Sequence, residues 1–325
     1  RSRRDLPGRS FCAHRSFRMS APMKLQMDLL LPDHRDQVGE SPVWSPAEQA
    51  LYWVDIEGRK LHRWTYADQH VQSWDTAERP ACIALHAAGG LIAGMDTGVF
   101  HLQPQVGGTL AATLLAGVDH PQPGMRFNDG RCDRQGRFWA GTMLLDMQQG
   151  AHVGALYRHD GEGQLHLQQD GMIVPNGLAF SPDGRTMYLS DSHPNVQTIW
   201  AYPYDTDTGT PHSPRVFVDM KPLPGRPDGA AVDADGGYWI CGNDAGQIHD
   251  FDAQGQWCQS LSVPMPKPSM CAFGGAKLDQ LVVTSILPAH MPRHTVAAIH
   301  SCCYHHFQLL SRFPSHGTPH GAQCQ

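Results

Sequence analysis

The feature that most constrains the fold is a short apolar run that recurs six times. The runs begin at residues 51, 91, 138, 187, 238 and 281, so their starts are 40, 47, 49, 51 and 43 residues apart. They read LYWVDI, LIAGMD, FWAGTM, MYLSDS, YWICGN and LVVTSI. This period is typical of propeller blades built from four short strands, because leucine-rich repeats are shorter and TPR or HEAT repeats show helical spacing. The repeat predicts an all-β fold, a six-bladed β-propeller.

A turn rich in Asp, Pro and Gly precedes most of these runs. Examples are SPAE at 45, DRQG at 133, SPDG at 181 and DADG at 233. Such turns connect the two strands of a hairpin. Each hairpin sends one strand away from a starting point and brings the next one back. The two ends of each hairpin should therefore lie on one face of the propeller.

Composition narrows the partners of the chain. The formal net charge of -6 comes with no basic stripe interleaved with aromatic residues, so a nucleic-acid surface is not expected and a small-molecule partner is. No apolar stretch is long enough to span a bilayer, and the start of the sequence lacks the apolar core of a secretory signal. The nine cysteines form no CxxC pair, which favours buried free thiols. We therefore expect a cytoplasmic protein without membrane contact.

The two ends of the sequence differ from the rest. Residues 1–22 contain six arginines and one acidic residue, and we expect a disordered or non-native leader. The propeller is assigned to residues 23–290. Residues 291–325 form a divergent tail, so closure of the last blade is left open. The tail region holds two HxxxH pairs, but each pair encloses a proline and lacks the glutamate of HExxH, which argues against a helical zinc site.

Four repeats carry a polar residue at the start of the outgoing strand, ten or eleven residues before the returning strand. These residues are Glu40, Asn128, Asn176 and Asp228. Equivalent positions in the repeats should converge at one face of the propeller. Any one of them alone could be a turn former, but four in register offer two carboxylates and two amide oxygens. We expect one divalent cation, Ca²⁺, Mg²⁺, Mn²⁺ or Zn²⁺, and oxygen ligands favour Ca²⁺ or another hard ion.

Two further residues are candidates for the mouth of the propeller. Arg126 lies two residues before Asn128, so both side chains of an extended segment should project from the same face. Asp146 follows the returning strand of the same hairpin and should lie beside Arg126. The alternatives are a surface ion pair for Arg126 and a solvated loop acid for Asp146. A loop histidine, His193, is expected to be solvated.

Several segments resemble the senescence-marker-protein, gluconolactonase and regucalcin family. They are GESPVW followed by LYWVDI, RFNDG followed by GRFWAGTM, PNGLAFSPDG followed by LSDS, and RPDGAAVDADGGYW, within residues 38–286. The resemblance implies a six-bladed propeller in which Glu40, Asn176 and Asp228 bind the metal. It also implies that Arg126 and Asn128 contact the substrate and that Asp228 is the catalytic acid/base. Asp146 stands where relatives often carry glutamate, so substrate specificity is expected to differ.

These observations lead to the hypothesis of metal-dependent hydrolysis of a sugar lactone to the aldonic acid. The cation would polarise the carbonyl, Asp228 would act as general acid/base, and Arg126 with Asn128 would orient the substrate. A covalent route is less attractive because GxSxG is absent. The alternatives are a non-catalytic calcium-binding or ligand-sensing propeller and a related propeller esterase with a more apolar mouth. The sugar, the native metal and the oligomeric state are not determined by the sequence.

Overall fold

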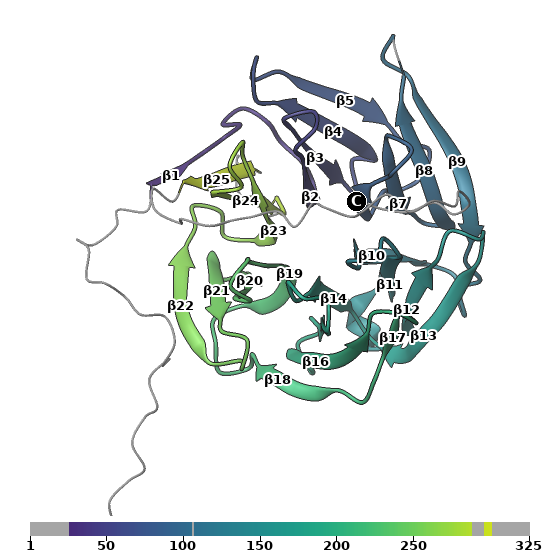
Figure 1. Ribbon diagram of the computed structural model, residues 1–325, viewed down its shortest axis with the longest axis vertical. Helices are drawn as coiled ribbons and strands as arrows, with labels where there is room; N and C mark the ends of the chain where they lie inside the picture. The colour runs from purple at the N-terminus through teal and green to yellow at the C-terminus, as the bar shows by residue number, and fades with distance from the viewer. Residues whose placement is uncertain (1–25, 106, 288–295, 301–325) are drawn as a thin grey trace, which may run out of the picture.

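The computed structural model describes residues 26–105, 107–287 and 296–300. These residues form six antiparallel sheets, arranged around a common centre with the first strand of each sheet innermost (Figure 1). The first three sheets consist of β2 (Gly39–Ser45), β3 (Ala50–Asp55), β4 (Lys60–Thr65) and β5 (Val71–Asp75); β6 (Cys82–Leu85), β7 (Leu91–Gly94), β8 (Gly98–Pro104) and β9 (Leu110–Gly117); and β10 (Met125–Cys132), β11 (Phe138–Leu144), β12 (Gly154–His159) and β13 (Leu165–Met172).

In the last of the other three sheets, the first and the last strands of the described chain, β1 and β25, pair with each other. In the fourth sheet, two short strands both pair with β16. A 3₁₀ turn, η1 (Met147–Gln149), follows β11. The strands are β14 (Pro175–Phe180), β15 (Thr186–Asp191), β16 (Thr198–Asp205), β17 (Thr210–Pro211) and β18 (Arg215–Asp219); β19 (Arg226–Val232), β20 (Tyr238–Asn243), β21 (Gln247–Phe251) and β22 (Trp257–Ser262); and β23 (Pro268–Gly274), β24 (Gln280–Ser285), β25 (Val296–His300) and β1 (Gln26–Asp28).

All six apolar runs form the second strands of the sheets. Every residue of β3, β11 and β20 is buried, and Trp53, Trp139 and Tyr238 are among the largest side chains of this core. Strands that are covered on both faces read as continuous apolar runs, since neither face meets water. The all-β propeller class expected from the repeat is confirmed.

The first strands of the sheets contact one another in a closed ring. The order of contact is β2, β6, β10, β14, β19 and β23, and β23 contacts β2 again. Because these strands are neighbours around the centre, residues at equivalent positions on them lie close together. The ring is the part of the fold that positions the candidate ligands.

The sheet that completes the ring contains both β1 and β25. In this sheet Gln26 pairs with His300 and Asp28 with Ala298, and Figure 1 shows the purple β1 beside the yellow-green β25. β25 lies beyond residue 290, where the sequence placed the end of the propeller. The proposed leader at 1–22 and both HxxxH pairs of the tail lie outside the described residues.

Two aspartates hold the chain where it enters a ligand-bearing strand. The carboxylate of Asp55 accepts from the backbone N–H groups of residues 37 and 38, at 2.9 and 3.0 Å, just before β2. Asp191 accepts from those of residues 173 and 174, at 2.8 and 3.1 Å, just before β14. Asp55 is the last residue of β3, and Asp191 is the last residue of β15. In both hairpins, the end of the returning strand therefore holds the start of the outgoing strand in place.

Among the cysteines of the described part, Cys82, Cys241 and Cys271 are buried free thiols. This agrees with the expectation from their spacing. Within the described part of the chain, no helix has the length and hydrophobicity needed to cross a membrane.

Candidate active site

The four polar residues expected as ligands lie on the first strands of four sheets. Glu40 is on β2, Asn128 on β10, Asn176 on β14 and Asp228 on β19. At or beside each of them the pairing with the second strand changes register. Such a bulge sets two residues opposite one and redirects side chains, so the ligands occupy irregular positions. The shifts fall between Glu40 and Val43, Phe127 and Gly130, Asn176 and Ala179, and Pro227 and Ala230.

Asn176 and Asp228 are in direct contact across two neighbouring sheets. Asn176 Nδ2 donates to Asp228 Oδ1 at 2.7 Å and to Ser192 Oγ at 3.3 Å. Both side chains are buried. Because the amide nitrogen of Asn176 makes these bonds, its oxygen is available as a ligand. The structure therefore brings together two of the three expected metal ligands.

A residue that the sequence reasoning missed, Asn243, holds the other side of the Asp228 carboxylate. Asn243 ends β20, the second strand of the same sheet, and its Nδ2 donates to Asp228 Oδ2. Its own Oδ1 is buried and has no hydrogen-bond partner. Asn243 lies on a returning strand, whereas the four residues expected from the repeat lie on outgoing strands. The signal that could have found Asn243 is the polar residue that ends the run YWICGN.

Glu40 shares this environment. The next residue, Ser41, has a φ of 51°, and its N–H donates to Glu40 Oε2 at 2.8 Å. Burial raises the pKa of Glu40 well above its ordinary value, and the negative charge of Asp228 raises it further. Burial also raises the pKa of Asp228 to about 7, against the opposing effect of hydrogen bonds from Asn243 and Asn176. The charge of Asp228 therefore destabilises the ionised form of Glu40.

Asp129 is a second residue that the sequence reasoning missed. It follows Asn128 inside the register shift of β10, is buried, and accepts from Leu178 N–H at 2.8 Å through Oδ2. Its Oδ1 has no hydrogen-bond partner. Burial raises the pKa of Asp129 to about 6. Its charge also raises the pKa values of Glu40 and Asp228. Asp129 is therefore a third acidic residue that makes the electrostatic potential at the site more negative.

This donor set fits a divalent cation. Glu40 and Asp228 offer carboxylate oxygens, Asn176 offers an amide oxygen, and the unpartnered Asn243 Oδ1 adds a buried polar atom nearby. A cation would favour the ionised form of both carboxylates, whose pKa values are raised by burial and by neighbouring negative charges. Ligands that are all oxygens suit a hard cation. That Glu40, Asn176 and Asp228 bind this cation stays a prediction.

Arg126 and Asn128 form a connected pair on β10. Arg126 Nη1 donates to Asn128 Oδ1 at 2.9 Å and to the carbonyl of Phe127 at 2.7 Å, while Asn128 Nδ2 donates to the carbonyl of Pro175 at 3.0 Å. Arg126 is only 8% exposed, so the alternative of a surface ion pair does not describe it. The pair adjoins Asn176, the residue after Pro175, and Arg126 Nε remains buried without a partner.

Asp146 is not linked to the other five candidate residues by any contact within the described ranges. It is exposed and caps η1, accepting from Gln148 N–H at 3.2 Å and from Gln149 Nε2 at 3.0 Å. The turn does adjoin the candidate site, because Leu145 N–H donates to the carbonyl of Gly124 at 2.9 Å, just before β10. Asp146 therefore lies in a loop beside Arg126, with its carboxylate engaged locally.

The expectation of a solvated His193 was wrong. This residue is buried at 7% exposure. Its Nδ1 accepts from Asn195 N–H at 3.3 Å, which leaves Nε2 to donate to the carbonyl of Met147 at 3.1 Å. His193 is buried because it connects the loop after β15 to η1. It thereby holds the loop that carries Asp146.

A cavity of about 240 Å³ lies elsewhere along the same strands. Its lining includes Trp44, Cys132, Phe180 and Val232, each four residues after one of the four candidate ligands. Four residues of strand span roughly 13 Å. The cavity therefore opens at the other end of the ring, where Arg131 also lines it, and it is separate from the candidate site.

Comparison with known proteins fits this geometry. Residues 38–287 match the family model described as the SMP-30/Gluconolactonase/LRE-like region. The chain belongs to this family. An SMP-30/gluconolactonase relative, the 6-deoxy-6-sulfogluconolactonase of Pseudomonas putida, is 39% identical over 251 residues, which are 76% of this chain and 83% of that protein. The resemblance inferred from the motifs is thus confirmed.

Two other similar proteins differ in what their names describe. The pentonolactonase of Haloferax volcanii is 35% identical over 252 residues, covering 77% of this chain and 81% of that protein. The crystal structure of a calcium-binding regucalcin from Agrobacterium tumefaciens has a TM-score of 0.76 and 27% identity, and covers 83% of this chain and 92% of that one. The SMP-30/gluconolactonase family therefore includes relatives named for lactone hydrolysis and relatives named for calcium binding.

Proposed function

We propose that this protein is a lactonase that hydrolyses a sugar lactone to the aldonic acid with the help of one divalent cation. The observation that carries the proposal is the Asp228 carboxylate, which is buried and held between the side-chain amides of Asn176 and Asn243. A carboxylate held in one orientation beside a reacting water is suited to general acid/base catalysis. The lactonase names of the relatives support the same reaction class.

In this proposal Glu40, Asn176 and Asp228 hold the cation, and Ca²⁺ is the preferred ion because the donors are oxygens. A divalent cation bound there supplies positive charge that stabilises the negative charge developing on the lactone carbonyl oxygen. Asn176 and Asn243 fix the orientation of the Asp228 carboxylate through one hydrogen bond on each of its oxygens. Asp228 can then face the reacting atoms in one defined orientation.

The remaining steps belong to the protein side chains. An oxygen of Asp228 accepts a proton from the attacking water and returns it to the ring oxygen as the ester C–O bond breaks. Arg126 and Asn128 orient the sugar, and the unpartnered Arg126 Nε is a donor available to the substrate. Asp146, from the η1 loop, is proposed to contact a sugar hydroxyl. Its shorter side chain than glutamate should affect which lactone is preferred.

The most direct test measures turnover of aldonolactones by pH-stat titration, with and without chelator. We expect the wild type to hydrolyse at least one of the glucono, galactono, arabinono and xylono forms, and chelator to abolish hydrolysis. Asp228→Asn should lower kcat about 10²- to 10³-fold. Asp170→Asn, an exposed acid on β13, is the matched control and should leave kcat unchanged.

Two results would favour the competing functions. Folded, calcium-loaded protein that binds Ca²⁺ but hydrolyses no lactone would support a calcium-binding or ligand-sensing protein, as the regucalcin structure suggests. Turnover of aryl esters in preference to lactones would support a propeller esterase. Lactone turnover that survives complete metal removal would overturn the metal-dependent mechanism.

We further propose that each of the six sheets is one blade, giving a six-bladed propeller. The six sheets and the closed ring of first strands support this count. A cytoplasmic location is also proposed, supported by the free thiols of Cys82, Cys241 and Cys271, because cysteines of secreted proteins are usually joined in disulfides.

A further inference from the structure

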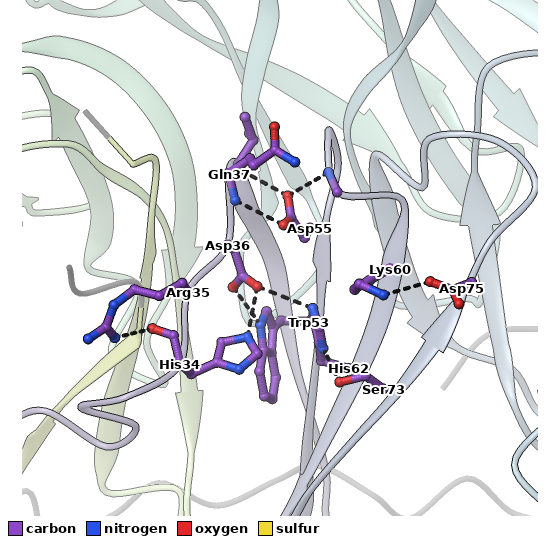
Figure 2. Close-up of polar contacts among 12 residues, drawn as sticks. His34, Arg35, Asp36, Gln37, Trp53, Asp55, Lys60, His62, Ser73 and Asp75 are labelled. Carbon is purple, nitrogen blue, oxygen red and sulfur yellow. Dashed lines mark hydrogen bonds and ion pairs between the residues drawn. The ribbon is translucent and has the colours of Figure 1, made fainter. Parts of the chain in front are cut away.

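A second group of metal-ligand side chains lies outside the candidate active site. His34 and Asp36 belong to residues 29–38, the segment that leads from β1 to β2, and His62 lies on β4. Asp36 Oδ1 is 2.7 Å from His34 Nε2 and 3.2 Å from His62 Nε2. One donor atom from each residue falls within 4.8 Å of the other two, and the three side chains point toward one another (Figure 2).

Neighbouring side chains hold this group in place. Trp53 Nε1 donates to Asp36 Oδ2 at 2.9 Å, and His62 Nδ1 lies 2.7 Å from Ser73 Oγ. The ring of His62 also stacks on Trp53, with centroids 5.0 Å apart and planes at 25°. These contacts engage Asp36 Oδ2 and His62 Nδ1, and in known metal sites hydrogen bonds to such outer atoms orient the ligands. Asp36 Oδ1 and the two Nε2 atoms are left facing a common point.

The same His–Ser pair occurs in the fifth sheet with a different outcome. His249 pairs with Ser260 across β21 and β22 as His62 pairs with Ser73 across β4 and β5. His249 Nδ1 lies 2.8 Å from Ser260 Oγ, and its Nε2 lies 2.8 Å from the carbonyl of Pro224. In His62 the corresponding Nε2 is buried and forms no hydrogen bond. The carboxylate of Asp36 stands where the other sheet uses a neutral carbonyl.

The burial of Asp36 adds to this difference. Its side chain is fully buried, that of His62 is 3% exposed and that of His34 is 17% exposed. If His62 donates its Nδ1 proton to Ser73, it presents an Nε2 lone pair to a carboxylate oxygen. A cation between these two atoms would remove that repulsion.

We propose that His34, Asp36 and His62 form a second, structural metal site for Zn²⁺, with water as the fourth ligand. Two imidazole nitrogens and one carboxylate oxygen suit Zn²⁺ better than Ca²⁺, which prefers oxygen ligands alone. Zinc–ligand bonds are roughly 2.0–2.2 Å, so ligand atoms around one ion lie about 3–4 Å apart. The present separations therefore require only small side-chain rotations. The partly exposed His34 leaves access for the ion and for water.

Such an ion would fasten the segment that carries β1 onto the first sheet. Residues 29–38 connect β1, in the closing sheet, to β2, in the first sheet, and Gln37 also accepts from Leu287 N–H at 3.0 Å. Binding to the folded state alone stabilises a protein in proportion to the logarithm of ligand concentration over Kd. The expected role of Zn²⁺ is therefore to stabilise ring closure, independently of lactone hydrolysis.

The test is equilibrium dialysis of the full chain against Zn²⁺ after metal removal, in excess Ca²⁺ so that the hard-cation site is filled. The wild type should retain one more zinc per chain than His34→Ala and His62→Gln. His249→Gln, the matched control, should retain as many as the wild type. The comparison is made as a difference because other histidines and cysteines of the chain can also bind zinc.

Two further measurements guard against a variant that fails to fold. Circular dichroism should show wild-type strand content for His34→Ala, which alters the most exposed of the three ligands. Zn²⁺ should raise the Tm of the wild type and of His249→Gln but not that of His34→Ala. Equal zinc content in the wild type and folded His34→Ala would overturn the proposal. Zinc content and Tm are measured without lactone, so this result does not depend on the proposed function.

Discussion

Asn243 donates its side-chain amide to Asp228 Oδ2 from the second strand of the same sheet, on the side of the carboxylate opposite to Asn176. Asp228 is therefore oriented by one residue of its own sheet and one of the neighbouring sheet. Orientation of this kind determines where the carboxylate oxygens point when a substrate and a cation are present.

Truncation of Asn243 should impair both metal binding and turnover. Asn243→Ala removes a hydrogen bond to a buried carboxylate, and loss of a hydrogen bond that orients a metal ligand typically costs about 10- to 100-fold in metal affinity or activity. Calcium titration and lactone kinetics check this. Asn195→Ala, at an exposed loop asparagine, is the control and should behave as the wild type. Unchanged calcium affinity and kcat in Asn243→Ala would contradict the orienting role.

Replacement of Arg126 by lysine should lower kcat/KM and leave the protein folded. Lysine keeps the charge but cannot reproduce the paired contacts of Nη1 with Asn128 Oδ1 and the Phe127 carbonyl. Loss of charge-assisted hydrogen bonds corresponds to about 10- to 150-fold in kcat/KM. Steady-state kinetics measures it, with Arg215→Lys, an exposed arginine, as control. A normal kcat/KM in Arg126→Lys would remove Arg126 from the substrate site.

Asp146→Asn separates the two roles considered for Asp146. Asparagine is as good a cap as aspartate, so η1 and the Tm should be retained. If the carboxylate also receives a hydrogen bond from a sugar hydroxyl, KM should rise several-fold, because charged acceptors bind more strongly. Kinetics over several aldonolactones provides the measurement. An unchanged KM for every lactone would leave Asp146 with the capping role alone.

In metal-free protein, Asp228 should make the wild type less stable as pH rises. The folded-state pKa of about 7 lies above the ordinary 3.8, so the favourable contribution of the protonated group is complete below 3.8 and is lost as pH rises through 7. Asp228→Asn does not titrate. The variant should therefore gain stability relative to the wild type between pH 5 and pH 8, by up to about 3 kcal/mol.

Urea unfolding in chelator at both pH values measures this difference. The comparison with the variant cancels the buried histidines, whose lowered pKa values act in the opposite direction near pH 6. Addition of Ca²⁺ should reverse the order at pH 8 and make the wild type the more stable protein. If the difference in unfolding free energy between wild type and variant does not depend on pH, the pKa of Asp228 is not raised in the folded, metal-free protein.

The sequence predicted the second strands well because a strand covered on both faces must be apolar along its whole length, as in β3 and β11. It also predicted where Glu40, Asn176 and Asp228 lie, because repeats impose equivalent positions. It missed Asp129, since regular alternation turns neighbouring residues to opposite faces and the register shift after Phe127 breaks that rule. His193 was misjudged because only tertiary packing against η1 buries it.

The pairing of β1 with β25 has a consequence for how the protein is made. The strand at residues 26–28 is synthesised before the other strands of the sheets, yet its partner at residues 296–300 is synthesised some 270 residues later. Contacts so distant in sequence carry a large loop-closure entropy and slow the rate-limiting step of folding. The closing sheet can therefore be completed only after residue 300 has been translated, so nascent chains should depend on chaperones until then.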